Sequence, residues 1–193
     1  MDSPTRETSR YSVEEYLGLT GSDTERTELI NGEIVAFASP MFIHQDISTE
    51  ITSELRRYIR KKGGKCRAYE NSNVKLNDST LIIPDVFVGC RPELFDKLKY
   101  NGAPDLAIEI VSSNRLHDFS TKLTLYQNNG TREYWIVDPK YSQTTVYFFE
   151  EHIEAEVYPF DKAIPVNIFK HNSDPLTINI AELIAPFVTE VQE

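Results

Sequence analysis

Two carboxylates stand inside apolar runs that otherwise have the composition of buried strands. Glu109 lies in "DLAIEIVSS" (105–113), and Asp85 lies in "TLIIPDVFVG" (80–89). Burying an unpaired carboxylate costs several kcal/mol or forces it to take up a proton. If the two runs form neighbouring strands, alternation of side chains lets both carboxylates point at the same place. There they repel each other unless a proton or a cation lies between them.

A hard divalent cation is the group that best relieves such a pair. Mg²⁺ prefers oxygen ligands and typically takes only one or two protein carboxylates, with water and phosphate oxygens in its other positions. Such an ion polarises a phosphate and helps make hydroxide from water. The sequence therefore predicts Mg²⁺ at Asp85 and Glu109, with Mn²⁺ as a substitute.

Lys122 is the candidate for the third member of this site. It lies on a predicted helix directly after the strand of Glu109, where it could orient or deprotonate the attacking water. Structural alternatives stay open for all three residues. Lys122 could form an i,i+4 pair with Asp118, Asp85 could be a turn residue after Pro84, and Glu109 could be satisfied by an arginine or by backbone N–H groups. In a purely structural protein, Lys122 would neutralise Glu109 as a buried ion pair.

Periodic patterns place these residues on a mixed sheet flanked by helices. Ser12 and Glu15 form a capping box, Asn31-Gly32 predicts a hairpin turn, and apolar residues four apart predict a helix that ends at Gly63-Gly64. Helices are expected at 11–19, 43–62 and 115–129. Strands are expected at 27–38 as a hairpin, at 66–76, 80–89, 104–113 and 132–139, at 144–160 as a pair, and at 176–187 with a closing helical turn.

The fold class is α/β (α+β), with a mixed sheet core flanked by helices and extra N- and C-terminal strands. The strand–helix–strand passage over 104–139 looks like a crossover unit with parallel strands. With 193 residues, of which 40% are hydrophobic and 26% charged, the chain fits one globular domain. We expect a single domain over 1–193, with its core at about 11–139 and C-terminal strands and a closing turn at 140–193.

The apolar runs and the cysteine content of the chain indicate the cellular compartment to expect. The apolar runs are too short to span a membrane, and the segment "MDSPTRETSRYS" has no signal-peptide core. The two cysteines, Cys66 and Cys90, are too few for a disulfide scaffold or a zinc site and suit a reducing compartment. A cytoplasmic protein without membrane partners is the expectation.

The charge is unevenly distributed along the chain. The net charge is −10, which argues against a protein that coats nucleic acid. The stretch "RRYIRKKGGKCR" (56–67), however, holds seven Lys and Arg residues and no acid. It could be a local phosphate-binding face built from Arg56, Arg57, Arg60 and Lys61. The alternative is an ordinary solvated helix face.

Several motifs then match a known family in order and spacing. They are "ELINGEI", His44 after "SPMFI", "IIPDVFV", "PDLAIEIVSS" and "DFSTKLTLYQNNGTREYWIVDP". Over about 11–139, and loosely to 186, the chain resembles the family of restriction endonuclease domains within the PD-(D/E)XK nuclease superfamily. The resemblance implies a restriction endonuclease-like fold and a divalent metal held by Asp85 and Glu109. The superfamily pattern expects a lysine two residues after the glutamate, where Val111 stands, and Lys122 matches the displaced lysine.

The resemblance also implies roles for further residues. Glu28 matches the early glutamate of the family and could be a further acidic or second-layer group at the site. His44 matches the histidine that begins the long helix and could contact a phosphate, with local helix hydrogen bonding as its alternative. Asp105 is expected to be structural, and Tyr134 and Trp135 are expected to lie in the core.

The function expected from these features is Mg²⁺-dependent endonucleolytic hydrolysis of phosphodiester bonds in DNA. The alternative is a catalytically idle nuclease fold that serves as a nucleic-acid-binding or regulatory protein, because fold does not determine function. By analogy with nucleases that cut both strands, a homodimer is expected.

Overall fold

A six-stranded sheet forms the middle of the molecule in the computed structural model, which describes residues 10–19, 27–36, 40–111, 115–151 and 154–188. The strand order is β11-β10-β9-β8-β6-β3. β8 and β9 are parallel, and the other neighbours are antiparallel. The strands are β3 (Arg67–Glu70), β6 (Val86–Gly89), β8 (Leu106–Ile110), β9 (Glu133–Asp138), β10 (Gln143–Phe148) and β11 (Glu156–Pro159). The expected interior position of β8 and the parallel crossover to β9 are thus confirmed.

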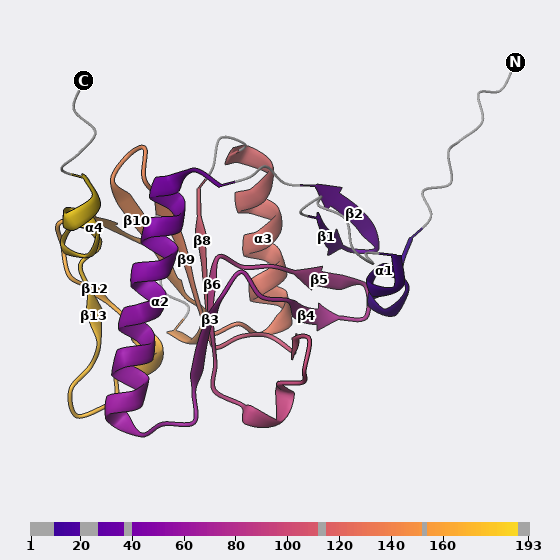
Figure 1. Cartoon of the computed structure of the whole chain (residues 1–193), viewed down its shortest axis with the longest axis horizontal. Coiled ribbons are helices and arrows are strands. Elements are labelled where there is room, and N and C mark those ends of the chain that lie inside the picture. The colour runs from indigo at the N-terminus through magenta and orange to yellow at the C-terminus, as the bar shows by residue number, and fades with distance from the viewer. Residues whose placement is uncertain (1–9, 20–26, 37–39, 112–114, 152–153, 189–193) are drawn as a thin grey trace, which may run out of the picture.

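Helices cover both faces of this sheet. α2 (Phe42–Lys62) and α4 (Ile180–Val188) pack with one face, and α3 (Arg115–Asn129) packs with the other. Figure 1 shows α2 and α3 on opposite sides of β3, β6 and β8. Alternate residues of β8 separate the two layers: Ile108 lies in the core under α2, whereas Ala107 lies in the core under α3. Glu109 shares the α3 side with Ala107.

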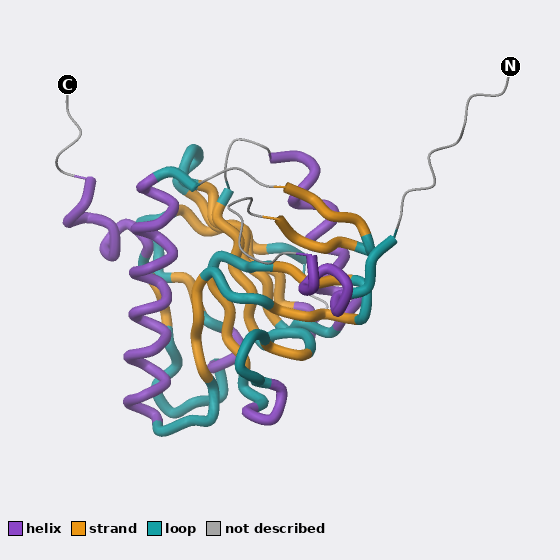
Figure 2. The backbone as a smooth tube through the Cα atoms, turned by 45° about the vertical axis from the view of Figure 1, so that its right-hand side comes forward, coloured by secondary structure: helices purple, strands orange, loops and turns teal. Residues whose placement is uncertain are grey.

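A second sheet of five strands lies beside α3, in the order β2-β1-β5-β4-β7. Its strands are β1 (Thr27–Ile30), β2 (Glu33–Ala36), β4 (Val74–Asn77), β5 (Thr80–Ile82) and β7 (Tyr100–Asn101). Figure 2 shows these strands extending away from α2. The predicted hairpin is confirmed, since Asn31 and Gly32 have φ values of 51° and 85° and join β1 to β2.

Two runs that were predicted as single strands each divide between the sheets, and those predictions were wrong in this respect. Residues 80–89 form β5 in one sheet and β6 in the other, with the break at Ile83-Pro84-Asp85. Pro84 has no N–H to donate to a ladder, so the strand cannot continue through it. Residues 66–76 divide in the same way into β3 and β4, near Asn71, whose φ is 47°.

Helix α2 follows its predicted apolar stripe. Ile47, Ile51 and Leu55 are fully buried, and Gly63 closes the helix with a left-handed φ of 64°. The basic residues of its second half face outward, as the spacing predicted. Among the described residues, no helix has the length and apolar composition needed to cross a membrane.

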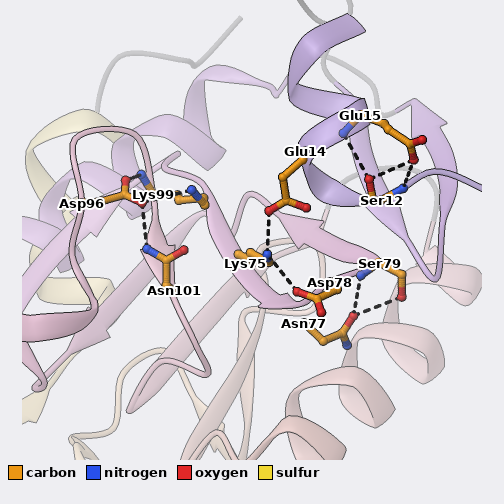
Figure 3. A network of polar contacts seen from close by, with 10 residues as sticks. All are labelled: Ser12, Glu14, Glu15, Lys75, Asn77, Asp78, Ser79, Asp96, Lys99 and Asn101. Carbon is orange, nitrogen blue, oxygen red and sulfur yellow. Dashed lines mark hydrogen bonds and ion pairs between the residues drawn. The ribbon is translucent and has the colours of Figure 1, made fainter.

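Polar contacts attach α1 (Val13–Leu19) to the turn between β4 and β5 (Figure 3). The predicted capping box is confirmed: the Ser12 N–H donates to Glu15 Oε2 at 2.8 Å, and the Glu15 N–H donates to Ser12 Oγ at 3.2 Å. Lys75 Nζ lies 2.8 Å from Glu14 Oε1 and 3.0 Å from Asp78 Oδ1. α1 is thereby fixed beside the sheet that carries Glu28.

The C-terminal segment is held to the central sheet by a buried carboxylate. Glu133 is fully buried, and Trp135 Nε1 donates to its Oε1 at 2.8 Å while the Ile168 N–H donates to its Oε2 at 2.8 Å. Tyr134 and Trp135 are core residues, as expected. This segment adds the small hairpin of β12 (Ile164–Pro165) and β13 (Thr177–Ile178).

The two cysteines depart from expectation. Cys66 and Cys90 were expected as separate thiols, but their sulfurs are joined at 2.02 Å. The reason lies in the register, because Arg67 pairs with Gly89 across β3 and β6 and so brings the two flanking cysteines face to face. Neither run shows this pairing by itself.

The first prediction concerns the α2 layer. Replacing Ile51 with alanine should lower the free energy of unfolding by about 2–5 kcal/mol, because a fully buried side chain leaves a cavity. Urea denaturation monitored by circular dichroism measures this. Ser53→Ala, on the exposed side of the same helix, is the control and should change stability by less than about 0.5 kcal/mol. Equal effects of the two substitutions would contradict the assigned packing.

Candidate functional site

Asp85 and Glu109 meet at one end of the central sheet. β6 and β8 are antiparallel, with Val86 opposite Ile108, so the next position along places Asp85 opposite Glu109. The Ile110 N–H donates to Asp85 Oδ2 at 2.7 Å, so the Asp85 side chain reaches across to the neighbouring strand. The proximity that was predicted from alternation and adjacency is confirmed.

Lys122 completes this cluster from α3 and connects it to the second sheet. Its Nζ lies 3.0 Å from Glu109 Oε1 and 3.1 Å from Glu28 Oε1. The Ile83 N–H also donates to Glu28 Oε1, at 2.8 Å. Four parts of the fold therefore bring these groups together: β1 carries Glu28, the residue just before β6 is Asp85, β8 carries Glu109 and α3 carries Lys122. The side chain of Asp118, the alternative partner of Lys122, lies outside what the structure describes.

Tyr126 belongs to the same cluster and was missed as a site residue. Its hydroxyl donates to Glu109 Oε1 at 2.7 Å, and its ring is fully buried against Tyr134, with 4.7 Å between ring centroids. The available signal was its position four residues after Lys122, on the same side of the helix. Its aromatic character instead suggested a plain core residue.

His44 approaches Asp85 from the α2 side. Its Nε2 lies 3.1 Å from Asp85 Oδ2, and the residue is 6% exposed. Its Nδ1 is buried and has no hydrogen-bond partner among the described residues. Among the described residues, the polar contact of this imidazole is therefore the one with Asp85. A contact between His44 and a phosphate stays a prediction.

Each carboxylate of the cluster has one oxygen that makes two polar contacts. Glu109 Oε1 accepts from Lys122 and Tyr126, Asp85 Oδ2 faces the Ile110 N–H and His44, and Glu28 Oε1 accepts from the Ile83 N–H and Lys122. The second oxygen of each group accepts no hydrogen bond from any residue that the structure describes. Within the described part of the chain, these three oxygens therefore keep unused acceptor capacity.

Buried carboxylates elsewhere in the molecule behave differently. Asp105, in the second Pro-Asp pair, accepts the Cys90 N–H on Oδ2 at 2.7 Å and faces Arg132 on Oδ1 at 3.2 Å. Glu133 likewise uses both oxygens. These contacts agree with the expected structural role of Asp105. Incomplete satisfaction thus distinguishes Asp85 and Glu109 from buried carboxylates that hold the fold together.

The cluster carries more negative than positive charge. Burial is the main cause that raises the pKa of Glu109, to about 8, and the nearby Asp85 and Glu28 raise it further while Lys122 lowers it. Burial alone would lower the pKa of Lys122, but the charges of Glu109, Glu28 and Asp85 outweigh it and raise that pKa. Burial also raises the pKa of Tyr126 well above its usual value. The three carboxylates favour an added cation, and Lys122 stays protonated.

The donors present fit a hard divalent cation. Asp85 and Glu109 each offer one carboxylate oxygen that accepts no hydrogen bond from the described residues, which suits an ion that takes one or two carboxylates and completes its sphere with water and substrate. In the described part of the chain, no set of three or more His, Cys, Asp or Glu side chains is arranged around a common metal position. A binding site closed entirely by protein ligands is therefore not formed by these residues.

The basic residues of α2 lie at the far end of the helix from His44. Arg56, Arg57, Arg60 and Lys61 are exposed. Sixteen residues separate His44 from Arg60, or about 24 Å at roughly 1.5 Å per residue. Arg56 Nε donates to the Ala68 carbonyl at 2.8 Å, Arg57 pairs with Glu54, and Lys61 Nζ lies 3.1 Å from Asp174 Oδ2. The structure therefore does not bring this basic group to the carboxylates.

Comparison with known proteins establishes the family. The family model Uma2, described as "Putative restriction endonuclease", matches residues 13–179. The chain belongs to the Uma2 family. A crystal structure described as "a putative nuclease belonging to DUF820", from Anabaena variabilis ATCC 29413, superimposes with a TM-score of 0.74 at 25% identity, over 91% of this chain and 98% of that one. The restriction endonuclease-like fold expected from the sequence is confirmed.

A relative of known sequence also matches this Uma2 chain. The uncharacterized protein slr1290 of Synechocystis sp. is 29% identical over 131 residues, which are 66% of this chain and 67% of the relative. The description of that protein names no activity, so the match shows that the two proteins are related but does not indicate a function.

The second prediction compares the two Pro-Asp aspartates of this Uma2 protein. Asp105→Asn should lower the free energy of unfolding by about 1–3 kcal/mol, because the new amide must face either the Cys90 N–H or Arg132. Asp85→Asn should leave stability unchanged or raise it, since it removes a negative charge and keeps an acceptor for the Ile110 N–H. Urea denaturation in EDTA measures both. A larger loss for Asp85→Asn would assign that residue to the scaffold.

The third prediction concerns pH. Because the pKa of Glu109 rises from 4.5 to about 8 on folding, the folded protein binds more protons than the unfolded chain between these values. The contribution of Glu109 to stability is therefore full below about pH 4.5 and is lost as pH rises through about 8. Denaturant unfolding in EDTA at pH 5.5 and 8.5 measures the change. Glu109→Gln should reduce the difference between the two pH values, and an unchanged difference would contradict the assignment.

Proposed function

We propose that this Uma2 protein is a divalent-metal-dependent nuclease that hydrolyses phosphodiester bonds in DNA. The observation that carries the proposal is the pair of opposed carboxylates, Asp85 and Glu109, beside the Lys122 ammonium. Each has one oxygen that accepts no hydrogen bond from the described residues. Membership of a family described as a restriction endonuclease and the fold shared with a nuclease support it.

The residues that would hold the metal are Asp85 and Glu109. When bound there, Mg²⁺ would polarise a phosphate oxygen and lower the pKa of a coordinated water. Mn²⁺ offers the same oxygen preference and serves as the experimental substitute. The excess of carboxylates favours this binding, because a cation would relieve the repulsion from Asp85 and Glu28 that helps to raise the pKa of Glu109.

Lys122 serves an electrostatic role in this proposal. Its ammonium lies between Glu109 and Glu28, and their charges raise its pKa, so it does not give up its proton near neutral pH. A fixed ammonium at this position stabilises negative charge that develops on a phosphate or on an attacking oxygen. We therefore assign Lys122 to charge stabilisation and orientation, rather than to the removal of a proton from water.

The position of the basic residues limits how DNA could use them. Arg60 and Lys61 lie about 24 Å from His44 along α2, at roughly 1.5 Å per residue. A duplex rises about 3.4 Å per base pair, so a substrate would have to extend about seven base pairs from the site to reach them. These residues would therefore contribute to the binding of long substrates and little to that of short ones.

Hydrolysis of DNA is the fourth prediction. The wild-type protein should convert supercoiled plasmid to nicked or linear forms with Mg²⁺ or Mn²⁺, and EDTA should abolish the reaction. Lys122→Gln and Glu109→Gln should each reduce the rate by about 100-fold or more, because charge stabilisation and metal binding are lost.

Asp105→Asn is the matched control, measured below its melting temperature, because it changes a carboxylate outside the cluster. Cleavage that survives Glu109→Gln would point to a contaminating nuclease. Salt-dependent DNA binding without cleavage under either metal would favour the idle nucleic-acid-binding protein over the nuclease.

A further inference from the structure

Two side chains outside the metal-binding pair control how its carboxylates are turned. Tyr126 and Lys122 both engage Glu109 Oε1, at 2.7 and 3.0 Å. His44 and the Ile110 N–H both engage Asp85 Oδ2, at 3.1 and 2.7 Å. The two contacts to Glu109 are hydrogen bonds, and those to Asp85 are one hydrogen bond and one ion-pair contact. A carboxylate with two polar contacts on one oxygen has little freedom to rotate, so its other oxygen points in a set direction.

The surroundings of Tyr126 suit it to orient the Glu109 carboxylate. The residue is fully buried, and its ring packs on Tyr134 with a centroid distance of 4.7 Å. Glu109 is the hydrogen-bond partner that the described residues provide for its hydroxyl. A phenylalanine would fill the same space, so the packing of this position does not require the hydroxyl.

His44, on the opposite side of the site, also has few polar contacts with the described residues. The side chain is almost wholly buried, and its polar contact with the described residues is the one from Nε2 to Asp85. Its Nδ1 is buried, and the described part of the chain offers it no hydrogen-bond partner. A buried polar atom without a partner is costly and calls for an explanation in function. The orientation of Asp85 supplies one, because an apolar residue would avoid this cost.

We propose that Tyr126 and His44 are positioning residues, which hold one oxygen each of Glu109 and Asp85 and thereby aim the other oxygen of each carboxylate at a shared divalent cation. This inference rests on the proposed metal site. It adds that the affinity for the cation depends on two residues that do not touch it. Partners of this kind that orient metal ligands typically contribute 10–100-fold to affinity.

Isothermal titration of Mn²⁺ into the purified protein tests this inference independently of activity. Tyr126→Phe should weaken Mn²⁺ binding by about tenfold or more. His44→Leu should do the same, whereas His44→Gln should restore most of the affinity, because its side-chain amide reaches about as far as Nε2 and can donate to Asp85. Tyr147→Phe is the matched control: Tyr147 lies in the same aromatic stack, 6.1 Å from Tyr134, away from Glu109, and should bind Mn²⁺ like the wild type.

Melting temperatures in EDTA separate positioning from folding. If Tyr126→Phe does not fold, the comparison of His44→Gln with His44→Leu decides the matter, since a purely structural histidine would not be rescued by glutamine in metal affinity alone. Wild-type binding of Mn²⁺ with equal affinity in Tyr126→Phe and His44→Leu would overturn this inference. An absence of Mn²⁺ binding in the wild type would instead overturn the metal site itself, and this inference with it.

Discussion

The contact of one buried ammonium with two carboxylates organises the functional end of this molecule. Lys122, on α3, lies between Glu109 of the six-stranded sheet and Glu28 of the five-stranded sheet. A charge buried without partners is strongly destabilising, so the loss of Lys122 would leave both carboxylates without their cationic partner. The two sheets and α3 must therefore pack in the one arrangement that brings these groups within about 3 Å of each other.

The same cluster shows how the protein separates folding from function. Asp105 and Glu133 are buried carboxylates with both oxygens engaged, and they fasten loops and the C-terminal segment to the sheet. Asp85 and Glu109 are each engaged on one side only. Functional sites commonly violate the rules of a well-satisfied interior, and the remainder of the fold sustains that cost. The incomplete satisfaction of these two side chains is thus the feature on which the proposed metal-binding role rests.

Patterns of residues within one element were predictable from the sequence. A period of two placed Glu109 on the strand face opposite Ile108, and apolar spacing placed Ile47, Ile51 and Leu55 in one buried stripe. Features that depend on contacts between distant segments were harder to predict. The join of Cys66 to Cys90 follows from the register of β3 with β6. The role of the Tyr126 hydroxyl follows from where α3 lies over β8, which spacing along the helix does not specify.

Because residues 80–89 divide between the two sheets at Pro84, the geometry of the site depends on how these sheets pack together. One short chain segment leaves the five-stranded sheet at Ile83, whose N–H binds Glu28, and enters the six-stranded sheet just after Asp85. The distance between Glu28 and Asp85 is therefore determined by how the two sheets pack against each other. A shift of one sheet relative to the other by a fraction of an ångström would change the distances between the charged groups without altering any residue of the cluster. Substitutions in the apolar layer between the sheets, at positions such as Ile82 and Phe87, would thus change the geometry of the carboxylate cluster.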